Sequence, residues 1–318
     1  LYDYEDLFEG RLGEMPGAPI HLQLKSDARP KYIRPFPILR VHYDAMKIEA
    51  DHLEKIGVLQ KILDTPWSSP SFPIPKPNGT IRFLTDLRYV NTQVMRNPYP
   101  LPRIQDIFHN LEGFEYATAI DINMGYYHVP LDEDSQQICT TALPWGKYAY
   151  QRLPMGLACS PDFFQHWMDQ LFGDLPNCLI YLDDLLVLNR GSYEEHLTIL
   201  RQVFDRCRKF SLQINADKTD FAKRELPYLG FILSPEGIRP DPAKVEAIQR
   251  IKSPKNRKAL QSFLGMVNYI RATVPRHSES TAVLSSLTSS TKTFKWKQEH
   301  KEAFQNCKKA VMKATMLA

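Results

Sequence analysis

The sequence predicts an α+β fold, in which β-hairpins and helices form the front part of the chain and helices alone form its end. Alternating apolar runs flank an Asn-Gly pair at 78–79, which is a strong short-range signal for a β-hairpin. The apolar run 178–188 predicts a second hairpin, interrupted by two adjacent aspartates. From Asp241 onward the pattern is helical, with two prolines as breaks. The 318 residues can bury a large core, organised as two or three subdomains.

The elements nearest the N-terminus follow from local signals. The stretch up to about residue 39 is rich in proline and is predicted to be irregular. Apolar residues at helical spacing predict a helix over 44–56, with Asp44 as its N-cap and Gly57 as its end. Prolines within 66–77 predict that the following hairpin is exposed, because a central strand would need their missing N–H groups.

Further elements alternate between strands and helices. A short strand is predicted at 116–123, and a Ser-Pro pair opens a helix over 160–172, with Ser as N-cap and Pro at the first helical position. A long helix is predicted at 192–210 and another strand at 228–233. The predicted architecture is therefore an α+β body followed by an all-α region.

Composition excludes several classes of protein. The hydrophobic fraction is 43%, and no apolar stretch approaches the ~18 residues that cross a bilayer. We see no secretory signal segment, and a chain that starts at Leu1 is expected to be a piece of something longer. The odd number of scattered cysteines forms no CxxC pair or zinc spacing, which indicates reduced thiols in an intracellular compartment.

The charge is distributed unevenly. The net charge is +4, yet residues 250–318 hold fourteen Lys or Arg and three acidic residues, a net +11. The remainder therefore carries −7. A one-signed segment of this kind is typical of a surface that binds a polyanion, although a solvated basic helix face is the alternative.

Asp183-Asp184 lies inside the second predicted hairpin. Burying two neighbouring anions without a partner costs several kcal/mol, so a divalent cation is the natural partner. Adjacent strand residues point to opposite faces, so both carboxylates can face one ion pair only at a turn. We therefore place the tip of the hairpin at these two residues. The alternative is an ordinary solvated turn, in which Asp is common.

A second acidic strand supports the metal hypothesis. Asp121 lies between two isoleucines in the predicted strand 116–123. If this strand lies beside the hairpin, Asp121, Asp183 and Asp184 converge on one edge of a sheet. Three carboxylates suit two Mg²⁺ ions about 3.5–4 Å apart, which is the arrangement used for in-line phosphoryl or nucleotidyl transfer.

Collinear motifs carry a family resemblance. They are TPWSSPS at 65–71, KPNGTIR at 76–82, DLRYVN at 86–91, YPLPRI at 99–104, DINMGYYH at 121–128, LPMGLACSP at 153–161, YLDD at 181–184, YLGF at 228–231 and SFLGMVNY at 262–269. With these motifs the chain resembles the reverse transcriptase region of gypsy-type LTR retrotransposon Pol polyproteins and is similar to retroviral reverse transcriptases. The similarity covers nearly the whole chain.

The resemblance implies a right-hand polymerase fold of fingers, palm and thumb, with an antiparallel palm sheet flanked by helices. It implies an N-terminal lead-in at 1–40, fingers and palm at 41–235, thumb helices at 236–290, and a tether at 291–318 towards a missing RNase H domain. Within 41–235, the fingers would occupy about 41–95 and 129–155, and the palm about 96–128 and 156–235.

The implied activity is RNA-directed DNA synthesis, and each matching residue receives a role from the resemblance. Asp121, Asp183 and Asp184 would be the catalytic metal ligands, and Lys218 would protonate the leaving pyrophosphate. The residues implied to contact the incoming dNTP are Lys76, Arg82, Tyr126 and Met155, with the ring of Tyr126 as the steric gate against a 2′-OH. The implied primer grip is Leu229, Gly230 and Phe231, and the implied duplex-tracking residues are Arg250, Lys252, Lys255, Arg257 and Lys258.

Some positions depart from the family pattern. His128 replaces the usual Gln, Met155 replaces a Phe, and Thr219 replaces a Cys. None of these changes removes a charge from the implied metal site. They bear on fidelity and nucleotide affinity rather than on the class of reaction.

The implied cofactor is a pair of Mg²⁺ ions, with Mn²⁺ as the alternative. The implied partners are a primed RNA or DNA template, dNTPs, and the RNase H and integrase segments of a parent polyprotein, without a membrane; the sequence leaves a homodimer open. No RNase H activity is expected from this piece. The family implies cytoplasmic virus-like particles or the nucleus.

Two alternatives remain open. An RNA-dependent RNA polymerase would share the palm, but such enzymes usually carry Gly before the paired aspartates and need room for a 2′-OH where Tyr126 projects. A catalytically silent, host-adopted remnant would only bind nucleic acid. The intact Asp121, Asp183 and Asp184 argue against such loss of catalysis.

Overall fold

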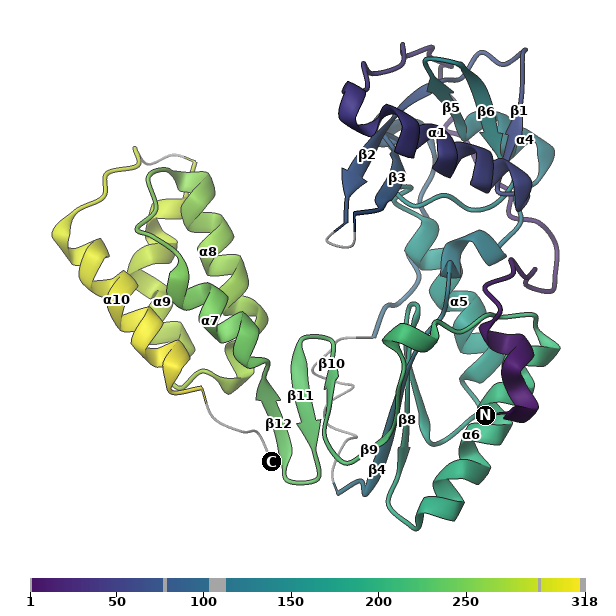
Figure 1. Ribbon diagram of the computed structural model, residues 1–318. Helices are drawn as coiled ribbons and strands as arrows, with labels where there is room; N and C mark the ends of the chain where they lie inside the picture. Colours follow the sequence, from purple (N-terminus) through teal and green to yellow (C-terminus); the bar gives the residue numbers. More distant parts are fainter. Residues whose placement is uncertain (1, 77–78, 103–112, 291–292, 315–318) are drawn as a thin grey trace. The chain divides into compact units, whose positions relative to one another are not determined.

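The computed structural model describes residues 2–76, 79–102, 113–290 and 293–314. These residues form two compact units. The first unit draws on the chain up to residue 102 and on residues 119–187 and 194–219. The second unit draws on residues 113–118, 188–193 and 220–314. Helices and sheets are mixed in the chain as the α+β prediction requires (Figure 1).

A five-stranded sheet in the first unit has the order β1-β6-β5-β2-β3. Its strands are β1 Leu59–Lys61, β2 Ser69–Pro75, β3 Ile81–Thr85, β5 Thr140–Leu143 and β6 Gly146–Tyr150. Helix α1 (Arg40–Lys55) packs on this sheet through its buried residues Met46, Ala50 and Leu53 (Figure 1). Burial of three apolar side chains at helical spacing is what holds an otherwise polar helix in place.

Two local predictions about this region need correction. The helix begins at Arg40 rather than at 44, and Leu39 precedes it without a side-chain cap, so packing rather than Asp44 defines its start. The β2–β3 hairpin is present, but β2 is not exposed along its whole length. Ser69 and Pro70 also pair with β5, while Pro73 and Pro75 lie beyond that pairing. Pro70 is therefore accommodated within the sheet, and only the outer half of the strand, with Pro73 and Pro75, lacks a second neighbour.

A second sheet has the order β7-β8-β4-β9. Its strands are β4 Tyr116–Asp121, β7 Cys178–Tyr181, β8 Asp184–Asn189 and β9 Asp220–Lys223. Helix α5 (Ser160–Phe172) packs against β7. Helix α6 (Tyr193–Lys209) is joined to the end of α5, because Arg206 donates to the Leu171 carbonyl at 2.8 Å. The predicted helices and strands of this region are thus present, but the N-cap of α5 is Cys159 rather than Ser160, and Pro161 is the second helical residue rather than the first. The Ser160 hydroxyl donates to the Pro154 carbonyl instead of capping the helix.

Short elements connect these parts. They are the 3₁₀ helices η1 Tyr2–Phe8, η2 Gly125–His128, η3 Ala216–Lys218, η4 Arg271–Thr273 and η5 Ser286–Thr288, and the helices α2 Arg88–Gln93 and α4 Glu133–Ile138.

The second unit contains a three-stranded sheet, β10-β11-β12. Its strands are β10 Leu226–Tyr228, β11 Phe231–Ser234 and β12 Gly237–Pro240. The prediction of one strand over 228–233 is therefore wrong: Leu229 and Gly230 form a tight turn with φ of 45° and 72°, and Tyr228 pairs with Phe231 across it. The predicted palm range 156–235 is also divided, since residues 220–235 belong to this unit.

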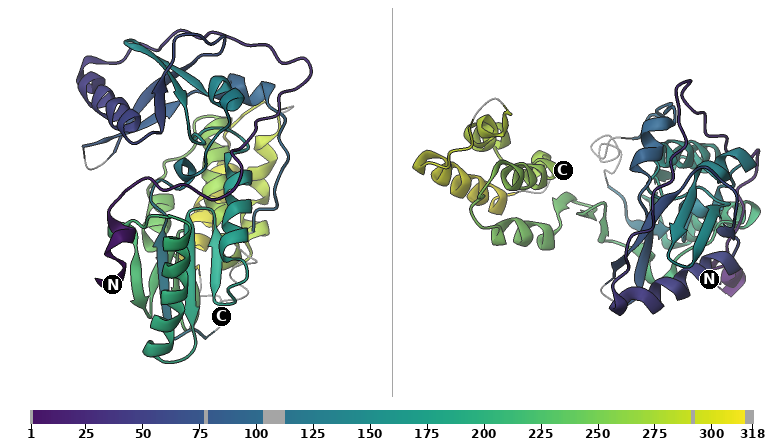
Figure 2. Two further views of the ribbon diagram at one scale, coloured as in Figure 1. Left: turned by 90° about the vertical axis from the view of Figure 1, so that its right-hand side faces the viewer. Right: turned by 90° about the horizontal axis from the view of Figure 1, so that it is seen from above.

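Helices α7 Pro242–Arg250, α8 Arg257–Tyr269, α9 His277–Ser285 and α10 Gln298–Met312 form one bundle (Figure 2). Pro254 and Pro275 fall between helices, as predicted. The range 291–318, interpreted as a tether, contains α10, which packs into this bundle. Its Phe304 packs on Phe263 at 4.5 Å, and the buried Lys308 donates to the carbonyls of Gln249 and Ile251.

We expect Phe304→Ala to destabilise the helical bundle by about 3–5 kcal/mol, because it empties a fully packed site. Phe304 is 1% exposed, and the ring of Trp296 lies 6.0 Å away and reports on the bundle. The measurement is urea unfolding followed by tryptophan fluorescence. The control is Met312→Ala, on the same helix but 67% exposed, which should change little. Equal midpoints for both variants would mean that α10 is not part of the bundle.

In the part of the chain that the structure describes, no helix combines the length and apolar character needed to span a bilayer.

Candidate active site

The paired aspartates lie at the turn between β7 and β8. Tyr181 pairs with Asp184, so the turn consists of Leu182 and Asp183, and Asp184 is the first residue of β8. The tip is thus one residue earlier than predicted. Leu182 has a φ of 54°, a left-handed conformation that costs a non-glycine residue about 1–2 kcal/mol.

Gln165 on α5 holds this turn in place. Its side chain is fully buried, and its amide oxygen accepts a hydrogen bond from the Leu182 N–H at 2.8 Å. Its amide nitrogen donates to Asp169 on the next helical turn. Sequence reasoning missed this residue. The only available signal was a polar side chain on the apolar face of the predicted helix 160–172.

Asp121 comes from the neighbouring strand β4. The N–H of Ile122 donates to the Asp183 carbonyl at 2.9 Å, which fixes the end of β4 beside the turn. Lys218, from η3, reaches the Asp121 carboxylate at 3.1 and 3.2 Å. The Asp121 side chain is 16% exposed and that of Lys218 is 62% exposed, so the pair lies at the surface of the site.

Burial and neighbouring negative charges raise the pKa of two of the three aspartates, Asp183 and Asp184. Burial raises the pKa of Asp183, and the Asp121 charge adds to the rise, while Lys218 and Arg82 oppose it. Burial, followed by the charges of Asp183 and Asp121, raises the pKa of Asp184 to about 6. Ionisation of Asp183 and Asp184 is therefore disfavoured by desolvation and by repulsion, and a bound cation would relieve both.

The donor set fits hard divalent cations, because Mg²⁺ prefers a few carboxylate oxygens together with phosphate oxygens. Among residues 2–76, 79–102, 113–290 and 293–314, however, no three His, Cys, Asp or Glu side chains already stand together as a metal-binding group. The backbone brings Asp121, Asp183 and Asp184 next to one another. Their carboxylates do not converge on one point as the ligands of a bound ion would.

A cavity of about 280 Å³ opens in front of Asp121 and Asp183. The predicted site residues that line it are Asp121, Asp183, Lys218, Lys76, Arg82, Tyr126 and Met155. All of them belong to the first unit. The structure thus gathers the predicted nucleotide-binding residues, two of the three aspartates and the predicted proton donor around one space. Asp184 lies beside this cavity and is not among its lining residues.

The cationic side of the cavity comes from the β2–β3 hairpin. Arg82 pairs with Ile74 across the hairpin, and the Lys76 N–H donates to the Thr80 carbonyl at 2.8 Å. Gly79 has a φ of 81°, the left-handed conformation expected of the second residue of an Asn-Gly turn. Both cationic side chains are exposed. The turn residue Asn78 lies outside the described residues.

Tyr126 is held by its neighbours in η2. Its ring packs on the buried Phe164 at 5.1 Å, and burial raises the pKa of its hydroxyl to about 12. A Cβ on Gly125 would lie 2.9 Å from Phe164 and 3.4 Å from the Cβ of Asp183. Gly125 therefore allows the close approach that places Tyr126 beside the aspartates, a role that sequence reasoning did not assign to it.

His128 has a structural position. It is completely buried, and burial lowers its pKa to about 4, so the ring is neutral at physiological pH. Its Nδ1 lies 3.3 Å from the Met124 carbonyl and donates to it. The departure from the family pattern at this position therefore adds no charge near the cavity.

The predicted primer-grip residues form a compact cluster in the second unit. The Tyr269 hydroxyl donates to the Leu229 carbonyl at 2.5 Å, and the Tyr269 ring stacks on Phe231. The Lys244 ammonium lies 4.0 Å from the centre of the Tyr269 ring. Two helices, α7 and α8, thus brace the Leu229-Gly230 turn. Sequence reasoning missed Lys244 and did not assign Tyr269.

The predicted duplex-binding residues follow one another from the end of α7 into α8. Arg250, Lys252, Lys255 and Lys258 are exposed, and Arg257 is half-buried. Arg250 is paired with Glu246 at 2.5 Å. The segment remains strongly basic, since this pair involves one of the five cations.

Residues 74–233, half of the chain, match the family described as "Reverse transcriptase (RNA-dependent DNA polymerase)". The chain is 30% identical over 296 residues to the retrovirus-related Pol polyprotein from transposon 297 of Drosophila melanogaster, covering 91% of this chain and 28% of the relative.

Two solved structures are also similar. The foamy viral protease-reverse transcriptase dRH in complex with double-stranded DNA has a TM-score of 0.90 at 29% identity, covering all of this chain and 56% of that one. The foamy viral protease-reverse transcriptase in complex with an RNA/DNA hybrid has a TM-score of 0.88 at 29% identity, covering all of this chain and 43% of that one. The chain thus spans only part of each relative.

Proposed function

Because this chain belongs to the reverse transcriptase family of RNA-dependent DNA polymerases, we propose that it extends a primer 3′-hydroxyl with deoxynucleotides on an RNA or DNA template. The observation that carries the proposal is the cavity in which two half-buried carboxylates face three cationic side chains. The triphosphate of a nucleotide is a polyanion that cationic side chains bind, and its reaction needs metal ions that carboxylates bind. The cavity offers cationic side chains and carboxylates together.

Asp121, Asp183 and Asp184 are the residues that would hold two Mg²⁺ ions. When bound, the ions would supply charge stabilisation and a more acidic primer hydroxyl. The protein's own contribution is to hold the backbone of the three aspartates close together. Gln165 fixes the turn that carries Asp183, and the hydrogen bond from Ile122 to that turn fixes Asp121 beside it. Mn²⁺ would fit the same oxygen donors.

Lys76 and Arg82 are proposed to bind the triphosphate. Arg can bind two phosphate oxygens at once, while Lys acts as a point charge. Both project from an exposed hairpin on the rim of the cavity. Tyr126 would lie under the sugar, and its ring would clash with a 2′-hydroxyl. Met155 lines the same cavity and would contact the sugar from another side.

Lys218 is proposed to donate a proton to the leaving pyrophosphate. Its ammonium lies within hydrogen-bonding distance of Asp121, and Lys218 lines the cavity in which the phosphates would bind. General acid catalysis of this kind contributes about 10²–10⁴-fold to a rate.

We propose that the second unit binds the nucleic acid. Leu229, Gly230 and Phe231 would contact the primer, and Arg250, Lys252, Lys255, Arg257 and Lys258 would contact duplex phosphates. The two foamy viral proteins were solved in complex with double-stranded DNA and with an RNA/DNA hybrid, which supports this proposal. We further propose that the chain acts together with the RNase H and integrase segments of a parent polyprotein, and that a homodimer is its possible assembly. Its proposed location is a virus-like particle in the cytoplasm, or the nucleus.

The test is primer extension on a homopolymeric RNA template with a DNA primer, in Mg²⁺ and in Mn²⁺, with deoxy- and ribonucleotides in parallel. Metal-dependent incorporation of deoxynucleotides is the expected result. A folded protein that binds the primed template and incorporates no nucleotide with either metal would favour the silent, nucleic-acid-binding alternative.

Gly230→Ala is expected to weaken primer use several-fold, at a cost of about 1–3 kcal/mol. The glycine has a φ of 72°, and a Cβ there would lie 1.7 Å from the Lys244 ammonium, which must move away from Tyr269. The measurement is the KM for the primed template, with the KM for dNTP as the internal comparison. Gly113→Ala is the matched control, because Gly113 has a φ of 67° with open space around it. An equal KM for primed template in both variants would contradict the role of the braced turn.

A further inference from the structure

The N-terminal segment (Tyr2–Phe8) is not a loose lead-in. It forms the 3₁₀ helix η1, in which Leu7 is 1% exposed and Tyr4 is 8% exposed. The Tyr4 ring packs against Phe204 of α6 at 5.2 Å, and its hydroxyl donates to Asp205 at 2.8 Å. Two buried apolar side chains and a satisfied hydroxyl keep the segment docked on the first unit.

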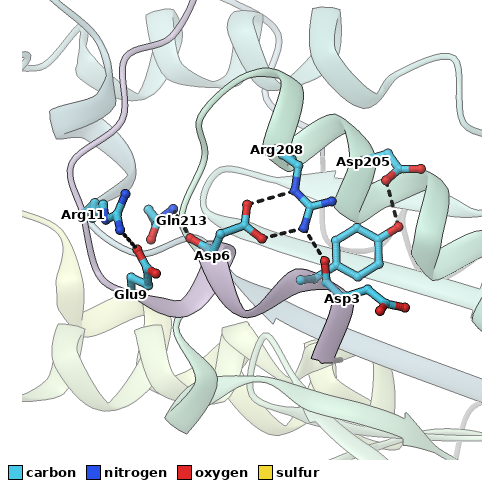
Figure 3. A network of polar contacts seen from close by, with 8 residues as sticks. Asp3, Asp6, Glu9, Arg11, Asp205, Arg208 and Gln213 are labelled. Atoms are coloured by element: carbon cyan, nitrogen blue, oxygen red, sulfur yellow. Dashed lines mark hydrogen bonds and ion pairs between the residues drawn. The ribbon is translucent and has the colours of Figure 1, made fainter.

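Arg208 of α6 holds this segment most strongly. Its guanidinium donates two hydrogen bonds to the Asp6 carboxylate, at 2.8 and 2.5 Å, and a third to the Asp3 carbonyl (Figure 3). It also lies 4.5 Å from the centre of the Tyr4 ring. The planar, two-pronged donor matches a carboxylate in a way that a lysine ammonium cannot reproduce.

The same segment holds the chain that leads to Lys218. The Ile214 N–H donates to the Leu7 carbonyl at 2.8 Å, and the Gln213 side chain donates to the Asp6 carbonyl at 3.0 Å. Both receiving groups belong to the N-terminal segment. Residues 213–214 are therefore bonded on one side to η1.

On their other side these residues are bonded to the end of β4. The Asn123 N–H donates to the Gln213 carbonyl at 2.8 Å, and the Asn215 N–H donates to the Asp121 carbonyl at 2.9 Å. Lys218 follows three residues after Asn215, at the end of η3. The strip of chain before Lys218 is thus bonded to the N-terminal segment and to the strand that carries Asp121.

We propose that the N-terminal segment is a positioning element of the active site, in which Arg208 and Asp6 keep Lys218 in place through residues 213–215. The proposal rests on the function proposed above, in particular on Lys218 as the proton donor. A three-residue 3₁₀ turn with an exposed lysine has little stability of its own, so its position depends on the chain that precedes it. A proton donor that is displaced by about 1 Å can lose up to ~10²-fold in rate.

The first experiment compares Arg208→Lys with Arg206→Lys in the full chain. Arg206 is the matched control: it lies on the same helix and forms a two-pronged ion pair with Asp174, which is not part of the N-terminal segment. We expect Arg208→Lys to lower the maximal single-turnover rate of nucleotide incorporation about 10-fold, with the dissociation constant of dNTP unchanged. Arg206→Lys should change neither. Equal effects of the two substitutions would overturn the proposal.

The second experiment asks whether Arg208 acts through Lys218. In a Lys218→Ala background, Arg208→Lys should cause no further loss of rate, because the group that it positions is gone. Independent, multiplicative losses would overturn the proposal and leave the function of Lys218 intact. A Lys218→Ala variant that keeps the full rate would overturn the proton-donor role, and the positioning proposal with it.

Folding is checked on each variant by its urea midpoint. If Arg208→Lys does not fold, Asp6→Asn takes its place, since this half-exposed carboxylate can be replaced by an amide of the same size. The amide keeps one acceptor for Arg208 and loses the charge. The same pattern is required of this variant: a slower maximal rate, an unchanged dNTP affinity, and no further loss in the Lys218→Ala background.

Discussion

Asp183→Asn should reduce the rate of deoxynucleotide incorporation by at least about 10³-fold in Mg²⁺, because a charged oxygen ligand is replaced by a neutral amide of the same shape. The substitution should not harm the fold. Burial and the nearby Asp121 charge both raise the pKa of Asp183, so replacing its ionisable carboxyl by a neutral amide removes a desolvation penalty and a repulsion. We expect the thermal midpoint to stay equal or to rise.

The measurement pairs primer extension with thermal unfolding of the same protein samples. Asp64→Asn is the control, because it makes the same chemical change away from the cavity. Asp64 is exposed on the loop after β1 and does not line the cavity. Lost activity with retained or increased stability identifies a functional carboxylate. A variant that keeps a tenth of the wild-type rate would remove Asp183 from the proposed metal site.

Tyr126→Ala should lower the discrimination between deoxy- and ribonucleotides by about 100-fold, which corresponds to about 2.7 kcal/mol. The reason is steric: a 2′-hydroxyl forced against a packed ring costs about 1–3 kcal/mol, and Tyr126 cannot move aside because its ring rests on the buried Phe164. The measurement is kcat/KM for each nucleotide on the same primed template.

Tyr126→Phe separates the ring from the hydroxyl. Because the pKa of Tyr126 is raised to about 12, the hydroxyl stays protonated across the assay range and adds no charge. Discrimination by Tyr126→Phe should therefore equal that of the wild type and should not vary between about pH 6 and pH 9, where a group with this pKa does not titrate. Loss of discrimination in Tyr126→Phe would assign the selectivity to the hydroxyl and contradict the steric gate.

The sequence by itself determined much of the local structure, and it singled out the residues that we propose to carry the chemistry. Charged residues inside apolar strands are costly without a partner, so Asp121 and Asp183 stand out from the pattern of residues alone. The Asn-Gly pair and the helical spacing from Asp241 onward depend only on neighbouring residues, and the structure confirms the hairpin and the helices. The resemblance supplied the family, which the match over residues 74–233 confirms.

Local patterns misplaced several features. The turn at Leu229-Gly230 was read as continuous strand, because apolar residues stand on both sides of it and the braces, Lys244 and Tyr269, come from distant helices. The resemblance implied a tether over 291–318, whereas α10 in this range contacts Phe263 and Gln249, which lie far away in the chain. In each case the deciding contact is between elements, which periodicity within one element does not record.

Only the tertiary structure decided how the site is supported. Gln165 reaches the turn of the aspartates from another helix, and Tyr4 and Asp205 form a hydrogen bond across 201 residues of sequence. Such pairings arise when distant segments pack together, because the Tyr4 ring is buried only where α6 provides the ring of Phe204. The types of residue in the site can thus be predicted one by one from the sequence. The position of Lys218, as we propose, depends on contacts between the N-terminal segment and residues 213–215, which only the tertiary structure shows.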